Sequence, residues 1–148
     1  LSKRTWAQLE ASHWVADGKA DAPRIVYTFS DPNCPYCNRF WQASRPWIDS
    51  GKVQLRHVLV GVIRADSANK AAAILAEGNE RNFAKGGIDP APTVPAQVRE
   101  KLSANQQLMV ELGFQGTPAI LFRDDEGLVQ RRSGMPAEQD LPVVLGAR

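Results

Sequence analysis

The sequence predicts an α/β fold, on two observations. A β-branched and aromatic run at residues 25–29 passes directly into a helix-like segment, and a second apolar run follows at residues 53–63. Strand, helix and strand in this order form a unit whose two strands are parallel neighbours. Both cysteines, Cys34 and Cys37, lie where the first strand becomes the helix, at the edge where open α/β sheets hold their sites.

The composition is ordinary for a soluble globular domain. At 148 residues the chain is long enough to bury a core without disulfide bonds. Lysine and arginine total 18 against 16 for aspartate and glutamate, which argues against nucleic acid or an anionic membrane as a partner. No apolar run approaches the length of a membrane span. The chain begins at Leu1 without an initiator methionine, so we expect a processed product or a fragment.

The first elements are a helix over residues 2–14 and a short edge strand at residues 14–16. We expect this helix to expose its tryptophan, Trp6, and to serve in docking or as a linker. Turn residues follow from Asp17, and His13 is interpreted as a bystander. Arg24 to Ser30 is the first central strand.

The helix after the cysteines keeps one apolar face through Phe40, Trp47 and Ile48, interpreted as packing against the sheet. Pro46 should kink or tighten it, and Gly51 is a natural stop. Arg39 is expected on its solvated outer face. The strand at residues 53–63 contains His57, interpreted as a strand residue, and its apolar second half indicates cover on both faces.

Residues 66–112 read as a helical insertion on the sheet. A helix over residues 71–76 ends near Gly78, and an irregular stretch runs to Pro95. Residues 96–102 form a second helix, and Ser103 with Gln106 predicts a capping box that starts a third, through residue 112. A proline-opened strand to residue 122, a second strand at 128–132 paired with it as a hairpin, and a last helix through residue 145 complete the chain.

The Cys-x-x-Cys motif carries the chemistry. The free N–H groups and the macrodipole at a helix start favour negative charge, so Cys34 should ionise more readily than an ordinary thiol. Pro35 suits the first turn, where its missing N–H would have had no partner. Cys37 lies one turn deeper, where it can attack a mixed disulfide formed at Cys34 and release the bound substrate.

Three other interpretations of the two cysteines stay open. A structural disulfide closing so short a loop would stabilise the fold by only about 2 kcal/mol. A zinc site needs four ligands, and only His13 and His57 are available as histidines beside the two cysteines. A pair of inert thiols does not suit the junction of strand and helix.

With Cys-Pro-Tyr-Cys upstream and Thr117-Pro118 opening a later strand, the chain resembles the thioredoxin superfamily. Along its whole length it is most similar to the catalytic domain of the periplasmic disulfide isomerases DsbC and DsbG, and proline at position 35 favours DsbG. The resemblance implies a cis peptide bond at Thr117-Pro118 that faces the cysteines and a substrate chain paired with that backbone. It also implies that Pro35 and Tyr36 tune Cys34. One departure is Thr28, which stands where thioredoxins carry a buried acid.

The resemblance implies a thioredoxin-like fold for residues 17–148, preceded by the end of a linker helix at residues 1–16. It implies a periplasmic thiol-disulfide oxidoreductase that reduces or reshuffles protein disulfides, and resemblance to DsbG suggests cysteine sulfenic acids as further substrates. Its only redox group would be the Cys34–Cys37 disulfide, without metal or other cofactor. A membrane reductant similar to DsbD, a homodimeric whole protein and a monomeric fragment are expected by the same analogy. A chaperone-like peptide-binding module and a DsbA-like net oxidase are the alternatives.

Overall fold

The computed structural model describes residues 2–61, 66–77 and 94–147, and it confirms the α/β fold. The described strands form a five-stranded sheet in the order β1-β3-β2-β4-β5. Central β2 and β3 are parallel, as the strand–helix–strand order predicts, and the other pairs are antiparallel. The strands are β1 (Trp14–Asp17), β2 (Arg24–Ser30), β3 (Val53–Leu59), β4 (Ala119–Arg123) and β5 (Val129–Ser133).

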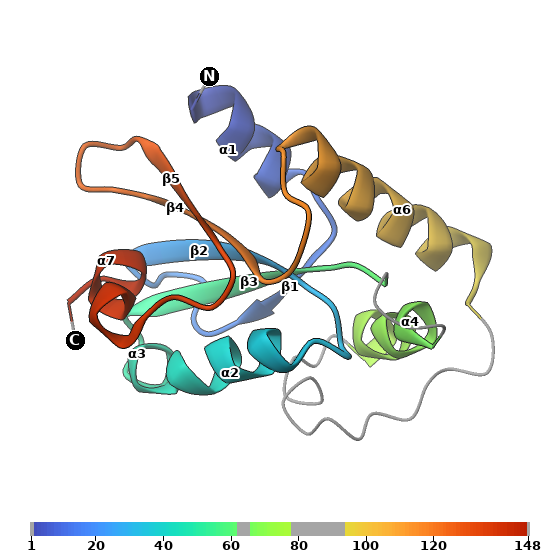
Figure 1. Ribbon diagram of the computed structural model, residues 1–148, viewed down its shortest axis with the longest axis horizontal. Helices are drawn as coiled ribbons and strands as arrows, with labels where there is room; N and C mark the ends of the chain where they lie inside the picture. The colour runs from blue at the N-terminus through green and yellow to red at the C-terminus, as the bar shows by residue number, and fades with distance from the viewer. Residues whose placement is uncertain (1, 62–65, 78–93, 148) are drawn as a thin grey trace.

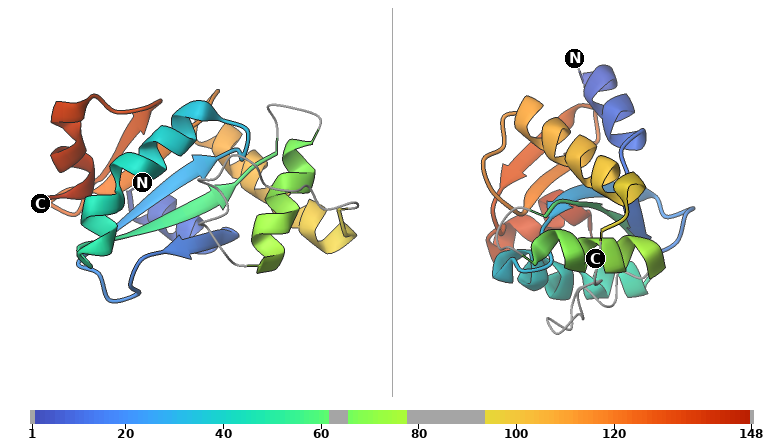
Figure 2. Two further views of the ribbon diagram at one scale, coloured as in Figure 1. Left: turned by 90° about the horizontal axis from the view of Figure 1, so that it is seen from below. Right: turned by 90° about the vertical axis from the view of Figure 1, so that its right-hand side faces the viewer.

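Helices cover both faces of this sheet (Figure 1). One face carries α1 (Ser2–Glu10) and α6 (Ala96–Glu111), and the other carries α2 (Pro35–Ala43), α3 (Arg45–Asp49) and α7 (Leu141–Leu145), the last preceded by the 3-10 turn η1 (Glu138–Asp140). The remaining helix of the described residues, α4 (Ser67–Glu77), lies beyond the carboxyl ends of β2 and β3, towards which their arrowheads point in Figure 2. The end of the sheet that holds the cysteines is therefore bordered by α2 and α4.

Alternation along β2 builds the two halves of the core. Tyr27 and Phe29 pack with α1 and α6 on one face, while Val26 packs with Phe40 of α2 on the other. All four side chains are buried. Because β2 is covered on both faces, all its residues from Val26 to Ser30 are buried, the polar Thr28 and Ser30 included.

Two sequence predictions about the helices are wrong. Trp6 is buried rather than exposed: only 6% of it is accessible, and its ring stands edge-on to that of Tyr27 with centroids 4.9 Å apart. The helix α1 thus contributes to the core, and its place at the end of a linker stays a prediction. Ser103 starts no separate helix, because α6 continues through it and the serine is an exposed residue in mid-helix.

Two other predicted boundaries agree with the structure, and the end of the second strand does not. The helix is interrupted at Ser44, which ends α2 and begins α3, two residues before Pro46. This agrees with the predicted kink, because Pro46 has no N–H for a continuous helix. Gly51 follows α3 with a φ of +77°, the left-handed conformation that ends helices. Strand β3 ends at Leu59, earlier than the predicted residue 63. The predicted end near Gly78 and most of the irregular stretch lie outside the described residues.

Candidate active site

Cys34 is the N-cap of α2. After β2 ends at Ser30, the carboxylate of Asp31 accepts the Asn33 N–H at 2.9 Å, and the Asp31 carbonyl accepts the Cys34 N–H at 3.0 Å. This turn places Cys34 in an extended conformation, with its Sγ accepting the backbone N–H of Cys37 at 3.2 Å. The sulfur therefore occupies the position that a serine or aspartate side chain takes at other helix starts.

The surroundings of Cys34 favour its thiolate. The hydrogen bond with the Cys37 side chain is the largest influence, and it helps to lower the pKa of Cys34 from the ordinary 9.0 to about 6. Burial acts in the opposite direction, while hydrogen bonds with the side chain of Thr117 and the N–H groups of Cys37 and Tyr36 lower the pKa further. At neutral pH Cys34 is then a thiolate in most molecules.

Cys37 has the opposite tendency. It lies one turn into α2, is only 2% exposed and packs with Leu59 and Ile74. Burial, followed by the hydrogen bond and the charge of Cys34, raises the pKa of Cys37 far above its usual value. Within one motif, Cys34 at the helix start is thus a thiolate, and Cys37 one turn further along is a protonated thiol.

Thr117 and Pro118 meet the cysteines from the other half of the chain. Their peptide bond is cis, and the Cys34 Sγ lies 3.6 Å from the Thr117 carbonyl oxygen. Pro118 is buried, and its carbonyl accepts the Gly134 N–H at 2.8 Å, which ties the loop before β4 to the end of β5. Pro35 and Tyr36 face outward, and Tyr36 is 54% exposed.

The thioredoxin-like domain model matches residues 15–145, nearly all of the chain. The chain belongs to the thioredoxin-like domain family. It is 47% identical over its whole length to the thiol:disulfide interchange protein DsbG of Pseudomonas aeruginosa, of which it covers 61%. It is 29% identical over 83% of its length to a probable thiol:disulfide interchange protein DsbC of Bordetella parapertussis, of which it covers 43%. The chain therefore spans less than two thirds of these relatives, and the greater similarity to DsbG agrees with the prediction from Pro35.

A solved structure agrees on the fold. The catalytic domain of Proteus mirabilis ScsC superposes with a TM-score of 0.77 over 98% of this chain and 97% of that domain, at 19% identity. At that identity the likeness concerns the thioredoxin-like fold alone. It supports the placement of the helices and strands around the cysteine end of the sheet.

Sequence reasoning missed one buried cluster of this thioredoxin-like domain. Asp17, assigned to a turn, is the last residue of β1 and only 2% exposed. Its carboxylate accepts Arg45 Nη1 at 3.1 Å, contacts Arg45 Nη2, and lies 3.4 Å from Nε2 of His57, which is also buried. Burial acts to raise the pKa of Asp17, but its bonds with His57 and Arg45 outweigh burial and hold the pKa below 3.8.

The cluster stands on the α2 side of the sheet, near where thioredoxins carry their buried acid. Thr28, at that position, is itself buried and pairs in register with His57. The signal that could have revealed Asp17 is its spacing from Val15, because residues two apart on a strand share a face. Val15 belongs to the same buried cluster as Cys34 and Cys37, so Asp17 points to that side of the sheet.

The zinc alternative receives no support from the described residues. None of them form a group of three or more histidine, cysteine or acidic side chains that could hold a metal ion. His13 is exposed, and its backbone N–H donates to Asn105 Oδ1 at 3.0 Å.

Among the described helices, none is long and apolar enough to cross a membrane.

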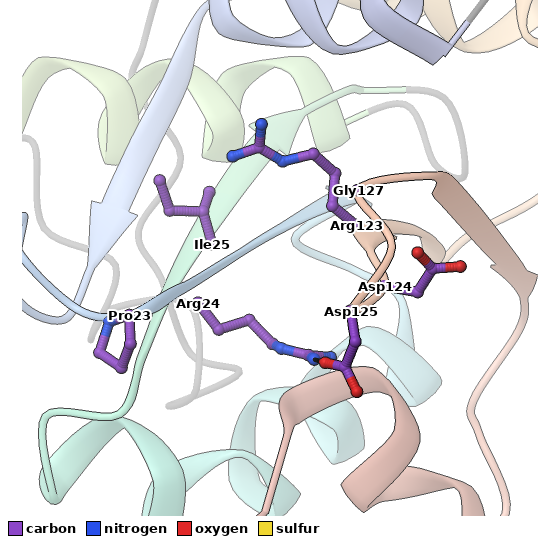
Figure 3. Close-up of a pocket in the computed structure, with 7 residues that line it drawn as sticks. All are labelled: Pro23, Arg24, Ile25, Arg123, Asp124, Asp125 and Gly127. Carbon is purple, nitrogen blue, oxygen red and sulfur yellow. Dashed lines mark ion pairs between the residues drawn. The ribbon is translucent and has the colours of Figure 1, made fainter.

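A hollow of about 300 Å³ lies at the other end of β2 (Figure 3). Arg24 and Asp125 border it and form an ion pair at 3.6 Å. Nη1 of Arg24 also donates to the carbonyls of Val143 and Val144 at 2.9 and 3.0 Å, which fixes the end of α7. These bonds give Arg24 a structural role at a distance of roughly 20 Å from the cysteine end, six residues along the strand.

Proposed function

We propose that this domain is a thiol-disulfide oxidoreductase and isomerase of the DsbG type, with Cys34 as nucleophile and Cys37 as resolving thiol. The observation that carries the proposal is the cap position of the Cys34 sulfur. There it accepts the Cys37 N–H at 3.2 Å and lies 3.6 Å from the Thr117 carbonyl. A sulfur held at a helix start, beside a second thiol and the Thr117 backbone, suits exchange with a cysteine of a protein substrate.

In the first step the Cys34 thiolate attacks one sulfur of a substrate disulfide. A Cys34–substrate disulfide forms, the substrate S–S bond breaks, and the second substrate sulfur leaves as a thiolate that takes a proton from water. With a sulfenic acid as substrate, the same attack forms the same mixed disulfide and expels hydroxide. No further cofactor is needed, because both electrons move between sulfur atoms.

In the second step Cys37 attacks the Cys34 sulfur, releases the substrate as a thiol and closes the Cys34–Cys37 disulfide. The charge of Cys34 is gone once it is tied in the mixed disulfide. Two of the causes that raise the pKa of Cys37 are its hydrogen bond with Cys34 and the charge of Cys34. Resolution is therefore favoured only after the first step. If a second thiolate of the substrate instead attacks the substrate sulfur of the mixed disulfide, a new substrate disulfide forms, Cys34 leaves as its thiolate, and the result is isomerisation.

The substrate backbone is proposed to pair with Thr117 as an added strand. Pro118 holds the preceding carbonyl beside Cys34, and the exposed Tyr36 borders the same end of α2. Similarity to DsbG supports a periplasmic location, a membrane reductant similar to DsbD and a homodimeric whole protein. The same similarity supports α1 as the end of a linker helix.

A net oxidase similar to DsbA is the second candidate, favoured by the low pKa of Cys34. A stabilised thiolate stabilises the reduced form and makes the disulfide more oxidising. The reduction potential separates the two functions. We expect a value nearer to about −180 mV, typical of an isomerase, than to about −120 mV, typical of a strong oxidant.

Turnover of a scrambled disulfide protein tests the proposal directly. Replacing Cys34 with serine should abolish reduction and reshuffling, while Cys37→Ala should accumulate mixed disulfides with the substrate. Cys34→Ser with undiminished reductase activity would refute the assigned roles. Mixed disulfides recovered with Cys37→Ala from periplasmic extract would identify the clients.

A further inference from the structure

A groove of about 480 Å³ opens directly beside Cys34, between α2 and α4. Its walls come from the turn before α2, the outer side of α2 and the side chain of Lys70 on α4. Thr117 is not part of its lining, so pairing of a substrate backbone with Thr117 does not use the residues that line the groove. A residue adjacent to the reacting cysteine can therefore enter it.

The charged side chains that line the described part of this groove are both cations, Arg39 and Lys70. The Arg39 guanidinium stands 5.2 Å from the Tyr36 ring centroid, on the exposed side of α2. Arg39 is on the outer face of the helix, as the sequence predicts, and that face forms a wall of the groove. Asn38 and Gln42 belong to the same wall, and Nε2 of Gln42 donates to Oδ1 of Asn38 at 2.9 Å.

Asn33, in the turn before α2, holds the Lys70 side chain on the side of Cys34. Its Nζ donates to Asn33 Oδ1 at 2.8 Å, while Nδ2 of Asn33 donates to Asp66 Oδ1 and Ser67 Oγ, both at 2.9 Å. Two acids stand nearby: Asp66, 3.7 Å from Lys70 Nζ and outside the lining, and Asp31, fully buried in the turn. Asp66 offsets part of the Lys70 charge, and Arg39 remains uncompensated among the ion pairs of the described residues.

We propose that this groove binds an acidic residue next to the reacting cysteine of the substrate, and that Arg39 and Lys70 determine this preference. The inference rests on the proposed function, because it names the substrate class of the same site. A carboxylate in the groove would approach two cations and the positive end of α2 together. Substrates with aspartate or glutamate beside the oxidised cysteine would then react faster than neutral or basic ones.

The test uses homodisulfides of three short peptides that differ only in the residues flanking cysteine: glutamate, glutamine or lysine. The reduced protein is mixed with each peptide at low ionic strength, and the release of peptide thiol is followed. Because flanking charges alter the reactivity of the peptide disulfide itself, each rate is divided by the rate with dithiothreitol. A change in the pKa of Cys34 affects all three peptides alike and cancels in the ratios.

We expect the glutamate peptide to exceed the glutamine peptide by about fivefold, and this ratio to fall towards one in 0.5 M salt. The double variant Arg39→Gln, Lys70→Gln should lose the preference, and the double variant Arg39→Glu, Lys70→Glu should reverse it. Lys52→Gln, an exposed substitution before β3 at the far end of the sheet, should keep it. Equal normalised rates in the unaltered protein, or a preference that survives in the double variant, would overturn the inference. Absence of reaction with every peptide would instead refute the proposed function, and the inference with it.

Discussion

Replacing Cys37 with alanine should raise the pKa of Cys34. The hydrogen bond with the Cys37 side chain is the largest cause of the low pKa, whereas the Cys37 backbone N–H, 3.2 Å from the Cys34 sulfur, survives the substitution. The new value should therefore fall between about 6 and 9.0. A pKa of about 6 leaves about 90% of Cys34 as thiolate at pH 7, against about 1% at 9.0. Over that whole range the preference for the thiolate is worth at most roughly 4 kcal/mol.

The assay follows thiolate absorbance and the rate of alkylation by iodoacetamide against pH, in the reduced protein. In Cys37→Ala the inflection should move to higher pH and the rate at pH 7 should fall, while the rate on the alkaline plateau rises because a more basic thiolate is more nucleophilic. Cys37→Ser is the matched control, since its hydroxyl keeps a donor at the same position. An inflection that stays at about pH 6 in Cys37→Ala would refute the reasoning and assign the effect to the helix start alone.

Four further predictions concern charge and stability. Cys34→Ala removes the hydrogen bond and the charge of Cys34, so the pKa of Cys37 should fall in an alkylation profile; an unchanged profile contradicts the proposed order of steps. The folded pKa of Cys34 lies below its unfolded value, so the reduced protein should gain up to about 3 kcal/mol of unfolding free energy from pH 6 to 8.5 in urea titrations, a gain absent in Cys34→Ala. Asp17→Asn should lower the free energy of unfolding by about 2–4 kcal/mol at pH 7. Because the pKa of Asp17 in the folded protein lies below 3.8, the difference between the variant and the unaltered protein should shrink as the pH falls below that value. An equal loss at pH 3 would argue against an ionised Asp17. Arg24→Ala should lower the free energy of unfolding by about 1–2 kcal/mol because the α7 carbonyls lose their donor, and Arg24→Lys should lower it less. An unchanged melting temperature of Arg24→Ala would contradict the structural role of Arg24.

The parts of the fold that the sequence predicts well depend on local patterns. A β-branched run, a turn with Asp31 and a proline in the first helical turn determine where β2 ends and α2 begins, and each acts through the backbone of neighbouring residues. The position of Cys34 at the helix start followed from that pattern alone. The cis bond at Thr117-Pro118 came only from resemblance, because most bonds before proline in folded proteins are trans.

The errors arose where distant packing decides the outcome. Ser103 and Gln106 have the pattern of a capping box, but α6 continues through them because Leu102, Asn105 and Leu108 keep one buried face across the supposed boundary. The helix pattern predicts an exposed Trp6, yet its ring packs edge-on against that of Tyr27 on β2. In both cases the deciding contact lies outside the local pattern.

The buried acid expected of a thioredoxin-like domain bears on how Cys37 loses its proton. Asp17 reaches the α2 side of the sheet from β1, but its bonds with His57 and Arg45 keep its pKa low. A carboxylate that stays ionised so far below neutral pH is a poor proton acceptor there, because an effective base has a pKa near the working pH. Asp17 therefore stabilises the sheet beneath the active-site helix rather than activating Cys37. Burial is the largest cause of the high pKa of Cys37, but the hydrogen bond and the charge of Cys34 also raise it. In the proposed mechanism, formation of the mixed disulfide removes the charge of Cys34 and so prepares Cys37 for the second step.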